Sequence, residues 1–449
     1  MKSIDFQLDI PADNPYKFDK LNRHSAIEMF SRIINGFPQG CVCSINAPWG
    51  MGKTQFVRML QIKLSQDGHK TFFFNAWESD YTEDPITAII SEMSISKQNK
   101  NFWGLMGRIV INVGKELGKG ALYKISGLDC DSAFEALADW SKKKVEDYEN
   151  QKTTIRQFKQ LLSEEIASSV SELPVIFFID ELDRCNPTFA VRTLERIKHI
   201  FDIPNIVFVL SIDKSQLGNS ICGYFGSDKF DAEEYLRRFI DIEYQLPEPS
   251  YERYIDYIAN KVGIEQDLRM EGSRAYEDFK RILSFQAAEK HLSLRQIEKL
   301  LIHVSIITSS FSTGALMEYV AFFVYLSFFE SEILDKIENK QYNDVSELLY
   351  DIQPFCPKTD DDYSFFIGKI LGLYGDYVGC LDLSNPESWL PQNNQYFSQD
   401  AAMQLIPGMK QIVKADYSHK IKLEEILRHI HLYSRITLSL IHISEPTRP

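Results

Sequence analysis

Five short runs of β-branched, aromatic or other apolar residues lie between positions 41 and 246. They are CVCSI (41–45), KTFFFNAW (70–77), PVIFFID (174–180), NIVFVLSID (205–213) and DIEYQL (241–246). Three of them are almost continuously apolar, which is typical of parallel strands that are buried on both faces. Between the runs, residues at helical spacing share one face, for example Phe56, Leu60 and Leu64. We therefore expect an α/β fold with an open, mainly parallel, five-stranded sheet and helices on both of its faces.

The stretch NAPWGMGKT (46–54) joins the first run to a helical pattern. It matches the phosphate-binding pattern G-x-x-x-x-G-K-[ST], except that Ala47 occupies the first glycine position. Glycines let backbone N–H groups wrap around phosphate oxygens, and alanine costs little at the first position if its φ is negative. Lys53 would reach the β- and γ-phosphates, and Thr54 would offer its hydroxyl to Mg²⁺. The predicted nucleotide-binding residues are Ala47, Pro48, Trp49, Gly50, Met51, Gly52, Lys53, Thr54 and Gln55.

A second motif, LPVIFFIDELDRCNP, is an apolar strand that ends in two acidic residues, Asp180 and Glu181. Asp180 would hold Mg²⁺ opposite Thr54, and Glu181 would polarise the attacking water. Open α/β sheets bind ligands at the carboxyl ends of their strands. Alone, DELD could be an ordinary surface turn. Together with the glycine-rich loop, it predicts a composite site for Mg²⁺ and a nucleotide.

Several stretches make the chain resemble the KAP family of P-loop NTPases over about residues 15–310. They are DKLNRHSAIEMFSRII, PWGMGKTQFVRML, FFFNAWESDYTEDPITAII, IDELDRCNPTFAVRTLERIKHIFDIPNIVFVLSIDKSQL, EEYLRRFIDIEYQLPEPS and HLSLRQIEKLL. The DELDR segment is the most specific of these. The resemblance implies a P-loop NTPase sheet of the additional-strand catalytic-glutamate type. In such a sheet a polar sensor strand lies between the strand that ends in Asp180 and the strand before the loop.

The resemblance also implies roles for residues outside the two motifs. Asp213 falls at the sensor position, where it would monitor the γ-phosphate or the water. Arg237 or Arg238 would act as an arginine finger on a neighbouring subunit, and Arg295 would be a second sensor on a lid-like helix. For each arginine the alternative is a solvated side chain or a weak surface ion pair. Trp77 is interpreted as a packing residue.

The predicted domains follow from where the strand pattern stops and resumes. Residues 1–90 and 173–249 would form the two parts of the NTPase core, and 91–172 would be a helical insertion between them. Residues 250–437 would form a helical lid and a C-terminal helical domain. The last segment, LSLIHISEPTR (438–448), resembles the translated end of a common sequencing adapter. We therefore expect a non-native tail at 438–449 and a natural protein that continues beyond Thr437; the alternative is a genuine short amphipathic tail.

Composition and charge limit the class of protein. The formal net charge of −14 argues against broad non-specific binding of nucleic acid. The seven cysteines include no C-x-x-C pair, which indicates reduced thiols in a cytoplasmic protein. The first residues lack the apolar region of a signal peptide, and the most apolar run, Leu316–Phe329, is short and contains Glu318. We expect this run to form a buried helix; contact with a membrane or a partner is the alternative.

These observations lead to an expected function. The chain is expected to be an Mg²⁺-dependent ATPase that acts as a switch or motor in the cytoplasm, with ATP and Mg²⁺ as cofactors. The preference for ATP, a homo-oligomeric or partner-bound state and a role in bacterial anti-phage defence are implied only by the resemblance. Two alternatives remain: a nucleotide-gated binding module that does not hydrolyse, and a membrane-associated signalling scaffold that uses Leu316–Phe329.

Overall fold

The computed structural model describes most of the two regions that flank the predicted insertion. The described residues are 10–17, 19–81, 85, 88–89, 159–160, 163, 173–200, 203–264, 273–311, 317–355, 361–381, 399–413 and 422–434. They form two compact units, one ending at Glu248 and the other beginning at Pro249. Nearly all of the predicted insertion at 91–172 and the whole of the tail at 438–449 lie outside the described residues. The predictions for those segments therefore stay predictions.

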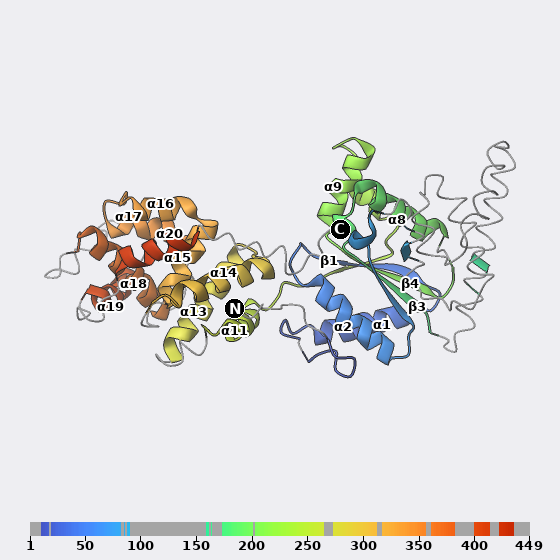
Figure 1. The fold of residues 1–449 in the computed structure, drawn as a ribbon, viewed down its shortest axis with the longest axis horizontal. Coiled ribbons are helices and arrows are strands. Elements are labelled where there is room, and N and C mark those ends of the chain that lie inside the picture. The colour runs from blue at the N-terminus through green and yellow to red at the C-terminus, as the bar shows by residue number, and fades with distance from the viewer. Residues whose placement is uncertain are drawn as a thin grey trace. The chain divides into compact units, whose positions relative to one another are not determined.

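The N-terminal unit is built on a parallel sheet of five strands (Figure 1). Along the sheet the order is β2-β3-β4-β1-β5, and every neighbouring pair is parallel. This confirms the predicted open parallel sheet and the position of β4 between β3 and β1. The carboxyl ends of all five strands consequently lie at one edge of the sheet. The strands are β1 (Cys41–Asn46), β2 (Thr71–Asn75), β3 (Val175–Asp180), β4 (Ile206–Ile212) and β5 (Ile242–Gln245).

Two hydrophobic clusters cover the two faces of the sheet, as the apolar strands require. One cluster joins the sheet to α1 (His24–Asn35) and α2 (Lys53–Gln66), and the other joins it to α8 (Pro187–Ile200) and α9 (Lys214–Phe225). Successive residues of β3 and β4 alternate between the clusters, because side chains in a strand point to opposite faces with a period of two. The remaining short elements of this unit are η1 (Trp77–Ser79), η3 (Leu182–Arg184) and α10 (Ala232–Leu236).

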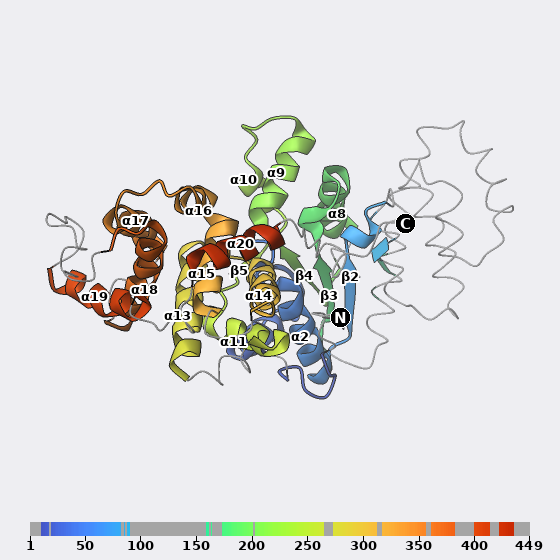
Figure 2. The ribbon, with the colours of Figure 1, turned by 60° about the vertical axis from the view of Figure 1, so that its left-hand side comes forward.

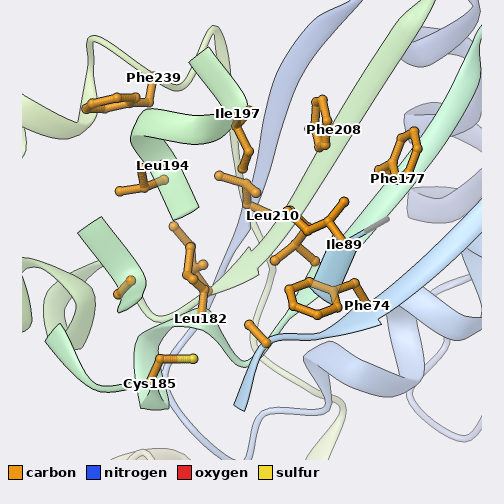
Figure 3. Packing of buried hydrophobic residues seen from close by; sticks show 14 of the residues in the cluster. Phe74, Ile89, Phe177, Leu182, Cys185, Leu194, Ile197, Phe208, Leu210 and Phe239 are labelled. Atoms are coloured by element: carbon orange, nitrogen blue, oxygen red, sulfur yellow. The ribbon is translucent and has the colours of Figure 1, made fainter. Parts of the chain in front are cut away.

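The second cluster is seen in detail in Figure 3, where Phe177, Phe208 and Leu210 of the sheet pack with Leu194 and Ile197 of α8. The rings of Phe177 and Phe208 stack with their centroids 5.2 Å apart. Burying one such side chain contributes about 1.5–3 kcal/mol. This packing fixes the positions of β3 and β4, and therefore of the polar residues that follow them.

The C-terminal unit is helical in its described part, as predicted (Figure 2). One of its helices, α14, begins with a capping box: Ser293 Oγ accepts from the N–H of Gln296, and the N–H of Ser293 donates to Gln296 Oε1 at 2.8 Å. The elements are α11 (Tyr251–Val262), α13 (Ser273–Glu289), α14 (Leu294–Thr308), α15 (Met317–Phe329), α16 (Ser331–Glu338), α17 (Val345–Ile352), η4 (Gln353–Phe355), α18 (Asp361–Val378), α19 (Gln399–Val413) and α20 (Leu423–Ser434).

The apolar run that raised the question of a membrane forms α15, which packs against α13, α14 and α20. Residues 318–326 of this helix are all buried, as predicted. Glu318 is buried because it pairs with Lys369 of α18, with 2.8 Å between Oε1 and Nζ. Across the described ranges, no helix combines the length and the hydrophobicity that a membrane crossing requires.

Candidate functional site

The loop between β1 and α2 has the backbone geometry that its glycines allow. Gly50 and Gly52 have φ values of 77° and 79°, in the left-handed region where a Cβ atom is unfavourable. Ala47 has no positive φ, and its N–H donates to the carbonyl of Ile212 at 3.2 Å. This bond extends the pairing of β1 with β4 by one residue. An alanine is therefore accommodated at the first position without backbone strain.

The first turn of α2 has the properties of an anion site. Gly52 is the N-cap, no side chain caps the helix, and its first turn contains no acidic residue. The first N–H groups of a helix have no partner within the helix, and its N-terminus carries a partial positive charge. A phosphate group supplies the acceptors and the negative charge that such a helix start favours. Thr54 is exposed and Gln55 is partly exposed in this same turn.

Lys53 is buried at the start of α2, with only 9% of its surface exposed. Its Nζ donates to the carbonyl oxygens of Ala47 at 2.6 Å and Pro48 at 3.2 Å. Burial lowers the pKa of Lys53, and the charges of Asp183, Asp213 and Asp180 partly counteract this. The ammonium group therefore donates to carbonyl oxygens of its own loop and is attracted by the negative charges of three carboxylates.

Asp180 is the last residue of β3 and Glu181 follows it, and the two differ in their surroundings. Asp180 is buried, and its Oδ1 accepts from the N–H of Glu181 at 3.1 Å. Glu181 has a φ of 61°, a left-handed conformation that costs a non-glycine residue about 1–2 kcal/mol. Its Oε2 accepts from Asn75 Nδ2 at 3.2 Å, and its Oε1 lies 3.3 Å from Nη1 of Arg184. The candidate general base is thus held by a neighbouring strand and by its own turn.

Asp183 links this turn to the glycine-rich loop. It is buried, and its Oδ2 accepts a hydrogen bond from Nε1 of Trp49. Burial raises the pKa of Asp183, while the charge of Lys53 and the bond from Trp49 act in the opposite direction. The second carboxylate oxygen, Oδ1, is buried, and no described group donates to it with good hydrogen-bond geometry, although the backbone N–H groups of Asp183 and Asp213 help to lower the pKa of the carboxyl. A buried polar atom without a partner is costly, and a bound ligand is one way of satisfying it.

The end of β4 contributes two polar residues. Asp213 is buried and caps α9, with its Oδ1 accepting from the N–H of Gln216 at 3.2 Å. Ser211 pairs in register with Asp180 on one side and with Ile45 on the other, and its hydroxyl is buried without a hydrogen-bond partner. The sequence analysis assigned no role to Ser211. Its signal was a single polar residue near the end of an otherwise apolar strand.

Arg23 was also missed, although it lies inside one of the stretches that carry the family resemblance. It is only 2% exposed, and its guanidinium donates to the carbonyls of Met51 at 2.8 Å and Gly52 at 3.1 Å. Burial lowers the pKa of Arg23 to about 10. These bonds hold the two residues that lead into α2, and Arg23 thereby supports the end of the loop.

Arg184 is the third residue that sequence reasoning did not single out. Its guanidinium carbon lies 5.8 Å from the ring centroid of Trp49 and 5.6 Å from that of Trp77. These distances are within the range of cation–π attraction. Trp77 itself is partly buried and packs against the second hydrophobic cluster. It begins a 3₁₀ turn and does not continue β2.

The three arginines with expected catalytic roles are all exposed. Arg237 pairs with Glu233 at 3.1 Å and with Glu234 at 3.4 Å. Arg295 lies at the start of α14 in the C-terminal unit. The finger and sensor roles of these arginines therefore stay predictions.

Comparisons with known proteins identify the same region of the chain. Residues 23–311 match the KAP family P-loop domain. The chain is 22% identical over 263 residues to the phage T7 exclusion protein of Escherichia coli (strain K12). The matched segment covers 54% of this chain and 34% of that protein. It therefore spans about a third of that relative's length.

Three solved structures show only a weak overall likeness to this chain. They are PCH-2 of C. elegans (14% identity, 70% of this chain and 69% of that chain, TM-score 0.31), ORC2 of Aeropyrum pernix (10%, 92% and 94%, 0.32) and Drosophila ORC bound to DNA (12%, 93% and 86%, 0.34).

Proposed function

The chain belongs to the KAP family of P-loop domains, and from this premise we propose that it is an Mg²⁺-dependent ATPase that acts as a switch or motor. One observation supports this proposal most directly. Lys53 lies in the field of Asp180, Asp183 and Asp213, beside the uncapped start of α2. A cation, three carboxylates and a helix N-terminus at the carboxyl edge of a parallel sheet suit a metal-bound polyphosphate.

The residues present fit both ATP and Mg²⁺. The N–H groups of Gly50 to Thr54 would donate hydrogen bonds to the phosphate oxygens. Lys53 would donate to phosphate oxygens in place of its loop carbonyls. Thr54 and Asp180 would hold Mg²⁺, and Oδ1 of Asp183, three residues after Asp180, would be a further acceptor. When bound, the ion supplies positive charge that neutralises the charge developing on the phosphates.

The chain's own side chains would carry the proton step. Glu181 would accept a proton from the attacking water, and Asp213 would orient that water or the γ-phosphate. Asn75 and Arg184 hold the carboxylate of Glu181 in this structure. We therefore expect at least one of these contacts to change before hydrolysis.

Phosphate release by the purified chain tests the enzymatic proposal. We expect Lys53→Ala to abolish release, and Glu181→Gln to lower it at least about 100-fold while ATP still binds. Lys214→Ala is the matched control, because Lys214 lies in the same unit and pairs with Glu243 at 2.7 Å. Release by the unaltered chain that does not exceed the Lys53→Ala background would contradict the proposal.

A nucleotide-gated binding module without hydrolysis is the second candidate. It is favoured by the two contacts that occupy both carboxylate oxygens of Glu181. Under this function ATP would bind with Lys53-dependent affinity, but Glu181→Gln would change nothing. The membrane-associated scaffold has less support, since residues 318–326 are buried inside the C-terminal unit.

The likeness to the phage T7 exclusion protein supports a proposed role in anti-phage defence in the bacterial cytoplasm. Plating of phage T7 on Escherichia coli that expresses this chain tests it, with Lys53→Ala as the control. We expect fewer plaques only with the unaltered chain. We also propose that Arg237 or Arg238 acts on a second copy or a partner, since both are exposed. An ATP-dependent increase in sedimentation that Arg237→Ala or Arg238→Ala prevents would support this assembly.

A further inference from the structure

Trp49 is a large aromatic residue on a loop that otherwise suits phosphate binding, and 45% of its surface is exposed. Its Nε1 donates to Asp183, which lies 134 residues further along the chain. This bond connects the loop to the turn that carries Glu181. Building on the proposed nucleotide site, we propose that Trp49 is a positioning residue that transmits occupancy of the loop to Glu181 through Asp183 and Arg184.

The first step of this coupling lies within one short turn. Asp183 and Arg184 are consecutive residues of η3, and the N–H of Arg184 donates to the carbonyl of Glu181 at 3.1 Å. The Arg184 guanidinium also pairs with the Glu181 carboxylate at 3.3 Å. Because a 3₁₀ turn is tightly wound, a displacement of Asp183 also displaces Arg184. Arg184 is in turn the cation that holds Glu181.

The second step is the difference between the two aromatic neighbours of Arg184. Trp77 is fixed to the end of β2, because its N–H donates to Asn75 Oδ1 at 3.1 Å. Asn75 also holds the second carboxylate oxygen of Glu181. Trp49, by contrast, lies on the phosphate-binding loop. A movement of the loop would therefore change the contact between Arg184 and Trp49, while Asn75 keeps its place.

The third step is the change that a phosphate would cause in the loop. Lys53 now donates to the carbonyls of Ala47 and Pro48, the two residues before Trp49. A phosphate oxygen is a stronger acceptor for an ammonium group than a neutral carbonyl. When Lys53 turns to the phosphate, those carbonyls are released and the segment next to Trp49 can shift. Asp183 and Arg184 then move with Trp49, and Glu181 becomes available to the water.

Tryptophan fluorescence tests the movement itself. The indole of Trp49 is bonded to a carboxylate and lies near a guanidinium, so ATP with Mg²⁺ should change its emission. The change should disappear in Trp49→Phe and remain in Trp77→Phe. Calorimetry with ATP and Mg²⁺ measures binding independently of fluorescence. An emission change that persists in Trp49→Phe would overturn the proposal.

Steady-state kinetics test the effect on Glu181. In Trp49→Phe, which keeps a ring but loses the N–H, we expect kcat to fall at least about 10-fold while KM stays within about 3-fold. Adding Arg184→Ala should restore kcat to within about 3-fold of the unaltered chain, because it removes the restraint on Glu181. A purely structural role for Trp49 predicts no such rescue. A double variant as slow as Trp49→Phe alone would contradict the coupling of Trp49 to Glu181.

The outcomes separate this inference from the proposed function. If calorimetry detects no ATP binding, or if Lys53→Ala hydrolyses as fast as the unaltered chain, then the proposed function is wrong, and so is the coupling of Trp49 to Glu181. If ATP binds and is hydrolysed, but Trp49→Phe has unaltered kcat and nucleotide leaves Trp49 emission unchanged, only the coupling is wrong. A circular dichroism melt of Trp49→Phe that matches the unaltered chain excludes a folding defect.

Discussion

Both units of this chain bury charged side chains, but they satisfy them in different ways. In the C-terminal unit Glu318 and Lys369 pair directly at 2.8 Å. In the N-terminal unit Lys53 donates to two backbone carbonyls. Among the described residues, each unit also keeps at least one buried carboxylate oxygen without a hydrogen-bond partner, for example Glu318 Oε2 and Asp183 Oδ1. Burying a charge is costly unless it is paired. The two lysines therefore differ: Lys369 is paired with a carboxylate inside the fold, whereas the charge of Lys53 would be paired by a bound phosphate.

The largest expected effect is on stability, through the pair of Glu318 and Lys369. Lys369→Met leaves Glu318 buried without its partner, and such a loss costs about 3–5 kcal/mol. We expect the free energy of unfolding of the C-terminal unit, measured with urea, to fall by that amount. The double variant Glu318→Gln with Lys369→Met should recover much of the loss, because it leaves no unpaired charge. A loss below about 1 kcal/mol in Lys369→Met would show that the pair is not important for stability.

Next in size is the arginine that holds the phosphate-binding loop. Lysine cannot reproduce the two bonds of Arg23 to Met51 and Gly52, so Arg23→Lys should leave a buried carbonyl without its donor at a cost of about 1–3 kcal/mol. ATP affinity should fall as well, since the loop loses its support. Unfolding and calorimetry measure the two effects. Arg32→Lys, at an exposed position on α1, is the control and should change neither.

Two glycines give a matched test of geometry against function. Gly52 in the loop has a φ of 79°, and Gly263 at the end of α11 has a φ of 86°. A Cβ atom at Gly263 would meet nothing within 4 Å. Alanine at either position should therefore cost about 1–2 kcal/mol of stability through the backbone alone. Only Gly52→Ala should weaken ATP binding; equal binding by both variants would contradict a phosphate site at the loop.

The smallest expected effect concerns Glu298, a half-buried acid on α14. Burial raises the pKa of Glu298 above its ordinary value of 4.5, although Tyr254 donates a hydrogen bond to it. A folded-state pKa above the unfolded value means that the folded chain holds the proton more tightly. Stability should thus fall as pH rises from 4.5 through the raised folded pKa.

Glu298→Gln should remove this fall and add less than about 1 kcal/mol of stability at neutral pH. Melting temperatures of the variant and the unaltered chain, measured across that pH range, test it. The same pH dependence in both proteins would assign the slope to other groups.

The sequence by itself determined the elements and the two motifs. The alternation along β3 and β4 has a period of two because consecutive side chains of a strand point to opposite faces. The loop from Ala47 to Thr54 could be recognised because its glycines are dictated by local backbone geometry. Asp180, Glu181 and Asp213 could be placed at strand ends for the same reason, since each directly follows an apolar run. These features depend on neighbours in the chain, which a sequence displays.

Only the tertiary structure decided which distant residues surround those motifs. The bond from Arg23 to Met51 spans 28 residues, that from Asn75 to Glu181 spans 106, and that from Trp49 to Asp183 spans 134. Their partners follow from strand order and register: Asn75 meets the turn after β3 because it pairs with Asp180 in the sheet. Order and register are set by how both faces of the whole sheet pack, and no local pattern encodes that packing. The loop pattern does not indicate a partner for the indole N–H of Trp49; the fold supplies one, the buried carboxylate of Asp183.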